Sequence, residues 1–389
     1  MLSRVADSIY WMSRYIERAE NVARFVDVNL HLLLDLPMGS TQQWQALVDT
    51  TGDSQEFLSR YGAATQKNVI RFLTFDVVNI NSIASCLRMA RENARSVREV
   101  ISSEMWEQVN QFYLMVSSAA ASRKSALSDP HEFFASVKTA SQLFAAVSDA
   151  TMTHNEGWHF QRLGRELERA DKTSRLLDVK YFLLLPAVAD VGTTADDLQW
   201  AAVLRSASAF EMYRKRHGRI RPDYVAAFLL LDPDFPRAVQ FCLLRARESV
   251  HAISGTVPGM FRNAAERLLG ELCSELAYSQ IVDIIGGGLH EYLDRLQSKM
   301  NEVSDGIYET FFAVRRAVPS ADRPSSRSFP ELPARSFPMV SQQETRSPRT
   351  VRSSVGTAEG IVESAKVVRG PQKAEVTVNA LAEGLGATG

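Results

Sequence analysis

The sequence has few cysteines and no long hydrophobic run. Its three cysteines, Cys86, Cys242 and Cys273, are too few and too widely spaced for a disulfide framework or a zinc site. We expect them to be reduced core residues of an intracellular protein. No stretch approaches the roughly 18 charge-free apolar residues of a transmembrane helix, and the N-terminal residues lack the apolar core of a signal peptide. These absences predict a cytoplasmic protein that does not enter a membrane.

An excess of charge of either sign is also lacking. The 44 lysines and arginines nearly balance the 45 aspartates and glutamates, so the formal net charge is −1. Such a chain has no overall field that would attract nucleic acid or an anionic membrane, and we expect neither as a partner. The glycine run 286–288 is not followed by the lysine of a phosphate-binding loop, and the seven histidines form no recognisable catalytic group. The sequence therefore predicts no cofactor, no metal site and no catalytic residue.

Strand signals are nearly absent, whereas helical periodicity is strong. The alternation and the hairpin dipeptides of β-sheets are missing. From Ile9 to Leu33 the apolar residues recur in steps of three and four, as on one face of a helix. The same periodicity predicts an all-α, multi-helix bundle. Its helices are expected over 5–36, 42–61, 67–101 (with a weak point near 78–82), 104–123, 130–147, 158–185, 195–217, 222–231, 237–253, 259–285 and 289–315.

The composition changes after Val318. The remaining residues are rich in proline, serine and arginine, and the tetrapeptide Arg-Ser-Phe-Pro occurs twice within RSFPELPARSFPM. Such a segment cannot bury enough apolar surface to offset its loss of conformational entropy, so we predict a disordered tail over 317–389. The two Phe-Pro pairs would suit a linear binding motif, but the composition favours a solvated tail with no such role.

The chain resembles itself at two places. Residues 14–28 match residues 165–179 in the type and register of their charges, and residues 72–92 match residues 228–248, with Cys86 aligned on Cys242. Two matched segments in the same order indicate a tandem duplication. We predict two helical repeats, residues 1–154 and residues 155–316, that form one compact body with pseudo-twofold symmetry.

A charged stripe accompanies this repeat. In the first copy Glu17, Glu20, Arg24 and Asp27 are spaced three, four and three residues apart, so they share one helix face. That face lies beside the apolar stripe, where a neighbouring helix is expected to pack. The adjacent Glu-Arg pairs of both copies are expected to meet near the pseudo-twofold axis. The candidate residues of this region are Glu17, Arg18, Glu20, Arg24, Arg91, Glu92, Glu168, Arg169, Asp171, Arg175, Arg247 and Glu248.

Two roles are open for these charges. In the first, Glu20–Arg24 and Asp171–Arg175 are pairs within one helix, and the other charges form a buried network that sets the helix register. In the second, the arginines form a fork for a carboxylate or a phosphate, and the glutamates orient them. We favour the structural role, because helical proteins often place Arg–Glu pairs between their helices.

Two segments carry a family resemblance. They are Tyr15–Glu20 and Leu163–Asp171, with Ile9-Tyr10-Trp11 ahead of the first and residues 177–181 after the second. Together they resemble the bacterial alpha-E family, a predicted helical domain named for its Glu-Arg motif. The resemblance covers about residues 1–316. It implies that the motif residues are Glu17, Arg18, Glu168 and Arg169.

The resemblance also implies a biological setting. Members of the family are often encoded beside, or fused to, ATP-grasp proteins and transglutaminase-like cysteine peptidases, in systems suspected of forming or modifying peptide bonds. This chain carries neither of those segments. We therefore expect an ATP-grasp ligase-like protein and a transglutaminase-like cysteine peptidase as separate protein partners.

Two hypotheses of function follow. The first is a non-catalytic accessory or scaffold protein of a bacterial ATP-grasp amide-ligase system, which holds an acidic ligand at the Glu-Arg residues. The alternative is a helical-bundle enzyme that uses the clustered Glu and Arg residues for acid/base chemistry or a di-metal carboxylate site. Glu248-Ser-Val-His251 has the spacing of a di-iron bundle, but the sequence contains no second copy of it.

Overall fold

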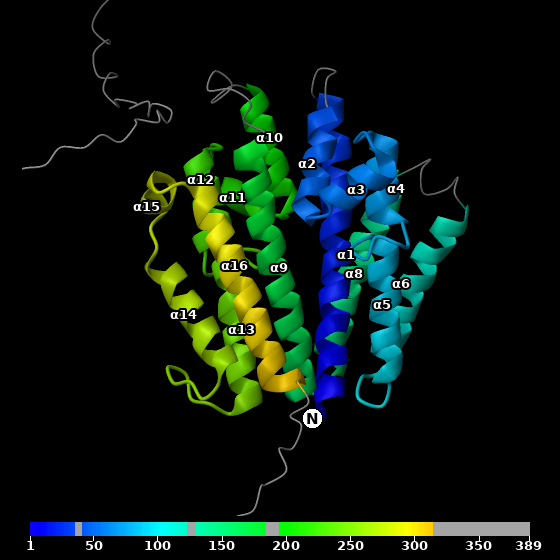
Figure 1. Cartoon of the computed structure of the whole chain (residues 1–389), viewed down its shortest axis with the longest axis vertical. Helices are drawn as coiled ribbons and strands as arrows, with labels where there is room; N and C mark the ends of the chain where they lie inside the picture. Colours follow the sequence, from blue (N-terminus) through cyan, green and yellow to red (C-terminus); the bar gives the residue numbers. More distant parts are fainter. Residues whose placement is uncertain (36–40, 123–129, 184–193, 314–389) are drawn as a thin grey trace, which may run out of the picture. The chain divides into compact units, whose positions relative to one another are not determined.

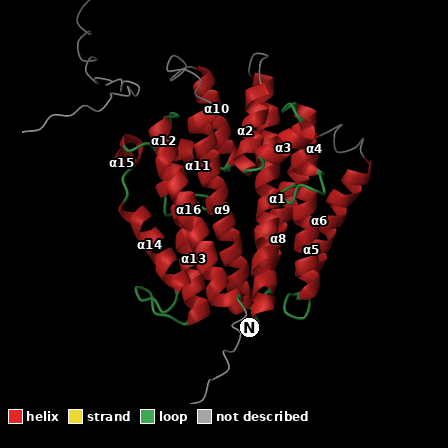
Figure 2. Cartoon of the chain, viewed as in Figure 1, coloured by secondary structure: helices red, strands yellow, loops and turns green. Residues whose placement is uncertain are grey.

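The computed structural model describes residues 1–35, 41–122, 130–183 and 194–313. Throughout these ranges every regular element is a helix and none is a strand (Figure 2). The predicted all-α class is therefore confirmed. Residues Met1–Val318 belong to one compact unit. The tail predicted over 317–389 lies outside the described residues. None of the described helices is long and apolar enough to cross a membrane.

The helices of the N-terminal part follow the predicted periodicity, with one additional break. The predicted helix 42–61 is two helices, because the chain turns at Gly52, whose φ of +82° favours glycine. The weak point near 78–82 separates two helices as expected. The elements are α1 (Ser3–Asp35), α2 (Thr41–Thr51), α3 (Ser54–Tyr61), α4 (Gln66–Thr74), α5 (Ile83–Ser96), α6 (Ser103–Ser122) and α8 (Pro130–Thr151).

The helices of the C-terminal part show two more breaks. The predicted helix 195–217 is interrupted at Ser208, which has a φ of +52°, and the predicted helix 259–285 begins only at Ala264 and stops after Tyr278. The elements are α9 (Glu156–Leu183), α10 (Thr194–Ser206), α11 (Phe210–His217), α12 (Pro222–Leu231), α13 (Val239–Ser254), α14 (Ala264–Tyr278), α15 (Ile281–Gly286), α16 (Leu289–Ile307) and the π-helical turn η2 (Tyr308–Phe312).

Helices α1 and α9 pack along each other at the centre of this unit. Helices α5 and α8 pack against α1, and α13 and α16 pack against α9 (Figure 1). The apolar stripe of α1 is buried from Ile9 to Leu30, as its spacing predicts. Gly164 of α9 permits a close approach, because a Cβ atom at this position would lie 2.3 Å from the carbonyl oxygen of Tyr10 on α1. This contact brings the charged flanks of the two helices face to face.

Corresponding residues of the two predicted repeats make corresponding contacts. Asp76 accepts hydrogen bonds from Arg60 and from a backbone N–H two residues further on. Asp232, which aligns with Asp76, accepts hydrogen bonds from Arg216 and from the backbone N–H of Asp234. Such matching contacts are what a duplication would produce. Superposition of the two halves stays a prediction of the sequence.

Candidate functional site

The Glu-Arg motifs of α1 and α9 bind each other crosswise. Glu168 of α9 accepts hydrogen bonds from Nε and Nη2 of Arg18 at 2.6 and 3.0 Å, and from Nε of Arg14 at 2.9 Å. In return, Glu17 of α1 accepts from Nε and Nη2 of Arg169 at 3.0 and 2.8 Å. Arg18 and Arg169 each donate two N–H groups to one carboxylate, the bidentate geometry of strong Arg–carboxylate pairs. We refer to these five residues as the Glu-Arg seam.

Both glutamates of the seam are buried and charged. Glu168 is 0% and Glu17 is 2% exposed. Burial alone would raise the pKa of each carboxyl, but the nearby guanidinium groups outweigh it. Arg169 and then Arg237 hold the pKa of Glu17 well below its usual range, and Arg18 does the same for the pKa of Glu168. At neutral pH the seam is therefore a buried network of ions.

Further along both helices, the expected pairs within one helix are present. Nε of Arg24 donates to Glu20 at 2.8 Å, and Nε of Arg175 donates to Asp171 at 3.0 Å. The second oxygen of Glu20 accepts a hydrogen bond from the hydroxyl of Ser141 on α8 at 2.6 Å. Glu20 thus links α1 to a third helix as well as to its own arginine.

Arg237 is a member of this region that the sequence did not reveal. It lies between α12 and α13, is buried, and donates to Glu17 at 2.8 Å and to Glu20 at 2.5 Å. Its aligned position in the first repeat is Asn81, which accepts a hydrogen bond from Arg18 at 2.8 Å. The same loop position therefore contacts the motif in both repeats. Because the residue type differs between the repeats, a search for matching charges could not find it.

The other two Glu-Arg pairs do not join the seam. Arg91 donates to Asn110 at 2.7 Å, and the side chain of its neighbour Glu92 is 41% exposed. Arg247 is partly buried, and the side chain of Glu248 is 50% exposed. In each helix the alanine just before the pair faces the core, so the pair is rotated outward by about 100° per residue. The prediction that all four Glu-Arg pairs meet at the pseudo-twofold axis is therefore wrong for these two pairs.

A small cavity lies against the seam, with a volume of about 160 Å³. Three guanidinium groups and two carboxylates line it, and a third carboxylate, that of Glu166, pairs with Arg165 at 3.1 Å. Two serines also contribute to the lining. The lining residues are Ser13, Ile16, Glu17, Glu20, Ser141, Gln142, Phe144, Ala145, Arg165, Arg169 and Arg237.

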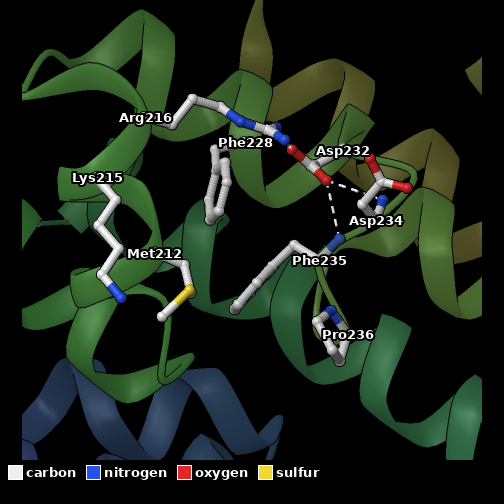
Figure 3. A pocket seen from close by; sticks show the side chains of 8 residues that line it. All are labelled: Met212, Lys215, Arg216, Phe228, Asp232, Asp234, Phe235 and Pro236. Carbon is white, nitrogen blue, oxygen red and sulfur yellow. Dashed lines mark hydrogen bonds and ion pairs between the residues drawn. The ribbon is translucent and has the colours of Figure 1, made fainter.

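A second, more open hollow of about 460 Å³ lies between α11, α12 and the loop before α13 (Figure 3). Phe228 and Phe235 form its apolar wall, with ring centroids 4.8 Å apart. On its polar side Asp232 pairs with Arg216 and accepts from the backbone N–H of Phe235 at 2.8 Å. This aspartate shapes the loop that delivers Arg237 to the seam. The polar side of the hollow therefore has a structural role.

The cysteines are free and buried, as expected. Burial raises the pKa of Cys86 to about 12 and that of Cys273 to about 12, and it raises the pKa of Cys242 as well. A buried thiol with a raised pKa stays protonated at neutral pH and is a poor nucleophile. The described structure therefore does not point to cysteine chemistry.

The fold and the seam define an all-helical protein whose two central helices are joined by reciprocal Glu–Arg pairs. The chain belongs to the Alpha-E family, described as a predicted alpha-helical domain with a conserved ER motif, and the family profile matches residues 1–312. Uncharacterized proteins of Mycobacterium bovis and Mycobacterium tuberculosis are 22% identical over 343 residues. The match covers 82% of this chain but only 38% of each relative. No solved structure matches the chain.

Proposed function

We propose that this protein is a non-catalytic scaffold that holds a small acidic ligand in the cavity beside the Glu-Arg seam. The single observation that carries the proposal is the lining of that cavity, to which Arg165, Arg169 and Arg237 all contribute. Arginine presents several N–H groups in a planar fork that matches a carboxylate. An acidic side chain of a peptide, or a small free carboxylic acid, would offer acceptors to these N–H groups.

The electrostatics of neighbouring residues support an anionic ligand. Burial, together with the closeness of Arg237, lowers the pKa of Arg24, so positive charge is crowded at this place. The volume of about 160 Å³ corresponds to about five waters at roughly 30 Å³ each. That space suits a small carboxylate better than a nucleotide.

The alternative, acid/base catalysis by the motif glutamates, has weaker support. An effective general base has a pKa near the working pH, whereas the pKa of Glu17 and that of Glu168 lie far below neutrality. Both oxygens of each carboxylate are also occupied by guanidinium N–H groups. A di-metal site at these glutamates would have to displace those arginines.

Isothermal titration calorimetry with L-glutamate and succinate as probes tests the ligand. We expect saturable binding of one molecule per chain. Arg165 is the residue to change, because it lines the cavity but contacts Glu166 rather than a seam glutamate. Arg165→Met should weaken binding about tenfold or more, since a charged hydrogen bond contributes about 1.5–3 kcal/mol.

The matched control is Arg245→Met, which removes an exposed arginine that pairs with Glu248 away from the cavity. It should leave the affinity unchanged. Absence of saturable binding for both probes would refute the ligand proposal. Equal losses in the two arginine variants would show that the probes respond only to overall charge.

The setting of this scaffold is the second part of the proposal. We infer that it acts in the cytoplasm of a bacterium as an accessory subunit of an ATP-grasp amide-ligase system. Its expected partners are an ATP-grasp ligase-like protein and a transglutaminase-like cysteine peptidase. This setting rests on what the resemblance of the sequence to the alpha-E family implies. Affinity purification of the full chain with mass spectrometry should recover at least one of these proteins, and consistent recovery of neither would count against it.

A further inference from the structure

Three side chains that commonly bind metals converge where α1 meets the start of α8. They are Asp27 and His31, one turn apart on α1, and His131, the second residue of α8. One ligand atom from each lies within 4.8 Å of the others. We propose that these three residues form a binding site for a divalent first-row transition-metal ion such as Zn²⁺, which favours imidazole nitrogen and carboxylate oxygen.

The distances suit a single shared ion. Oδ1 of Asp27 lies 2.8 Å from Nδ1 of His131 and 3.8 Å from Nδ1 of His31. Ligand atoms at about 2.0–2.2 Å from a tetrahedral Zn²⁺ lie roughly 3.4 Å from one another, between these two values. The ligand atoms of the two imidazoles, which lie within 4.8 Å of each other, would have to approach one another to share the ion.

The site is open on one side, so its members can adjust. The His31 side chain is 58% exposed, and its ring lies 3.9 Å from the ring of His131 between centroids. Nδ1 of His31 also lies 2.9 Å from the backbone carbonyl oxygen of Asp27. Rotation of the exposed His31 ring would break this contact and direct a ring nitrogen to the ion. Water supplies the fourth ligand from the open side, as in zinc sites with three protein ligands.

The carboxylate of Asp27 divides its two oxygens between two kinds of neighbour. Oδ1 faces the imidazoles, whereas Oδ2 accepts a hydrogen bond from Nζ of Lys138 at 2.6 Å. The ammonium group fixes the orientation of the carboxylate, which is mostly buried. It also repels a cation at this short distance, so the affinity for metal is a balance between orientation and repulsion.

This proposal is independent of the ligand cavity and departs from the expectation of no metal. That expectation considered Glu248-Ser-Val-His251, whose glutamate is bound to arginines instead. His31 and His131 lie far apart in the sequence, and only the packing of α8 on α1 brings them together. An ion at this place would tie these two helices at one end.

The test is calorimetric titration of untagged, full-length protein with Zn²⁺, after EDTA treatment and dialysis. We expect one ion per chain. His31→Ala and His131→Ala should each weaken binding at least about tenfold, since even indirect changes around metal sites cost that much. The matched control is His290→Ala, which removes a histidine that pairs with Asp178 at 2.6 Å outside the cluster. It should leave the affinity unchanged, and circular dichroism should confirm the helix content of every variant.

A fourth variant moves the affinity in the opposite direction. Lys138→Gln keeps a donor beside Asp27 but removes the repulsive charge, so it should tighten Zn²⁺ binding. Absence of saturable binding by the unaltered protein would overturn the proposal. It would also be overturned if both histidine variants bound like the unaltered protein, or if Lys138→Gln weakened binding or left it unchanged.

Discussion

Removal of the Glu168 carboxylate is the most direct test of the seam. This side chain is fully buried and accepts three hydrogen bonds from Arg14 and Arg18. In Glu168→Ala two mostly buried guanidinium groups would lose the counter-ion that they share. Breaking a buried ion pair on one side only typically destabilises a protein by about 3–5 kcal/mol.

The assay is thermal unfolding followed by circular dichroism. At about 2 °C per kcal/mol, the lower end of the range for domains of about 150–250 residues, the loss corresponds to a fall in Tm of about 6–10 °C. Glu92→Ala is the matched control, because Glu92 pairs with Arg91 and Arg95 on an exposed surface. That change should alter the free energy of unfolding by less than about 1 kcal/mol. If Glu168→Ala lowered Tm no more than the control does, the seam would contribute nothing to stability and the reasoning would be refuted.

Three more predictions concern stability. Gly164→Ala should cost about 1–3 kcal/mol, because the new Cβ would meet the Tyr10 carbonyl oxygen, whereas Gly270→Ala in open space should gain about 0.5–1 kcal/mol. Equal effects of these two changes in denaturant titrations would contradict the close helix contact. The lowered pKa of Glu17 in the folded state means that its contribution to stability is complete above its ordinary pKa of 4.5 and is lost as the pH falls below that value. Urea titrations at pH 7 and pH 3 should show this loss, and Glu17→Gln should lose less stability than the unaltered protein between the two. Asp232→Ala should cost about 1–3 kcal/mol, because it leaves the buried backbone N–H of Phe235 and the part-buried N–H of Asp234 without an acceptor. An unfolding midpoint within error of the unaltered protein would contradict that role.

The local pattern of the sequence determined the helices and the pairs within them. The apolar stripe of α1 and the pair Glu20–Arg24 both depend on a spacing of three or four residues, which the helix geometry fixes without reference to the rest of the chain. The breaks at Gly52 and Ser208 were missed, because the apolar period continues across them while a single backbone dihedral turns the chain.

The tertiary structure alone decided which charges meet. The sequence identified Glu17 and Glu168 as related residues, but their crosswise binding depends on the contact of α1 with α9 at Gly164. Arg237 reaches Glu17 of the seam from a loop, and His131 reaches Asp27 from another helix, at sequence separations that no periodic pattern records. A rotation of about 100° per residue turns neighbouring charges to different faces, so only the packing of the helices decides which of them are buried together.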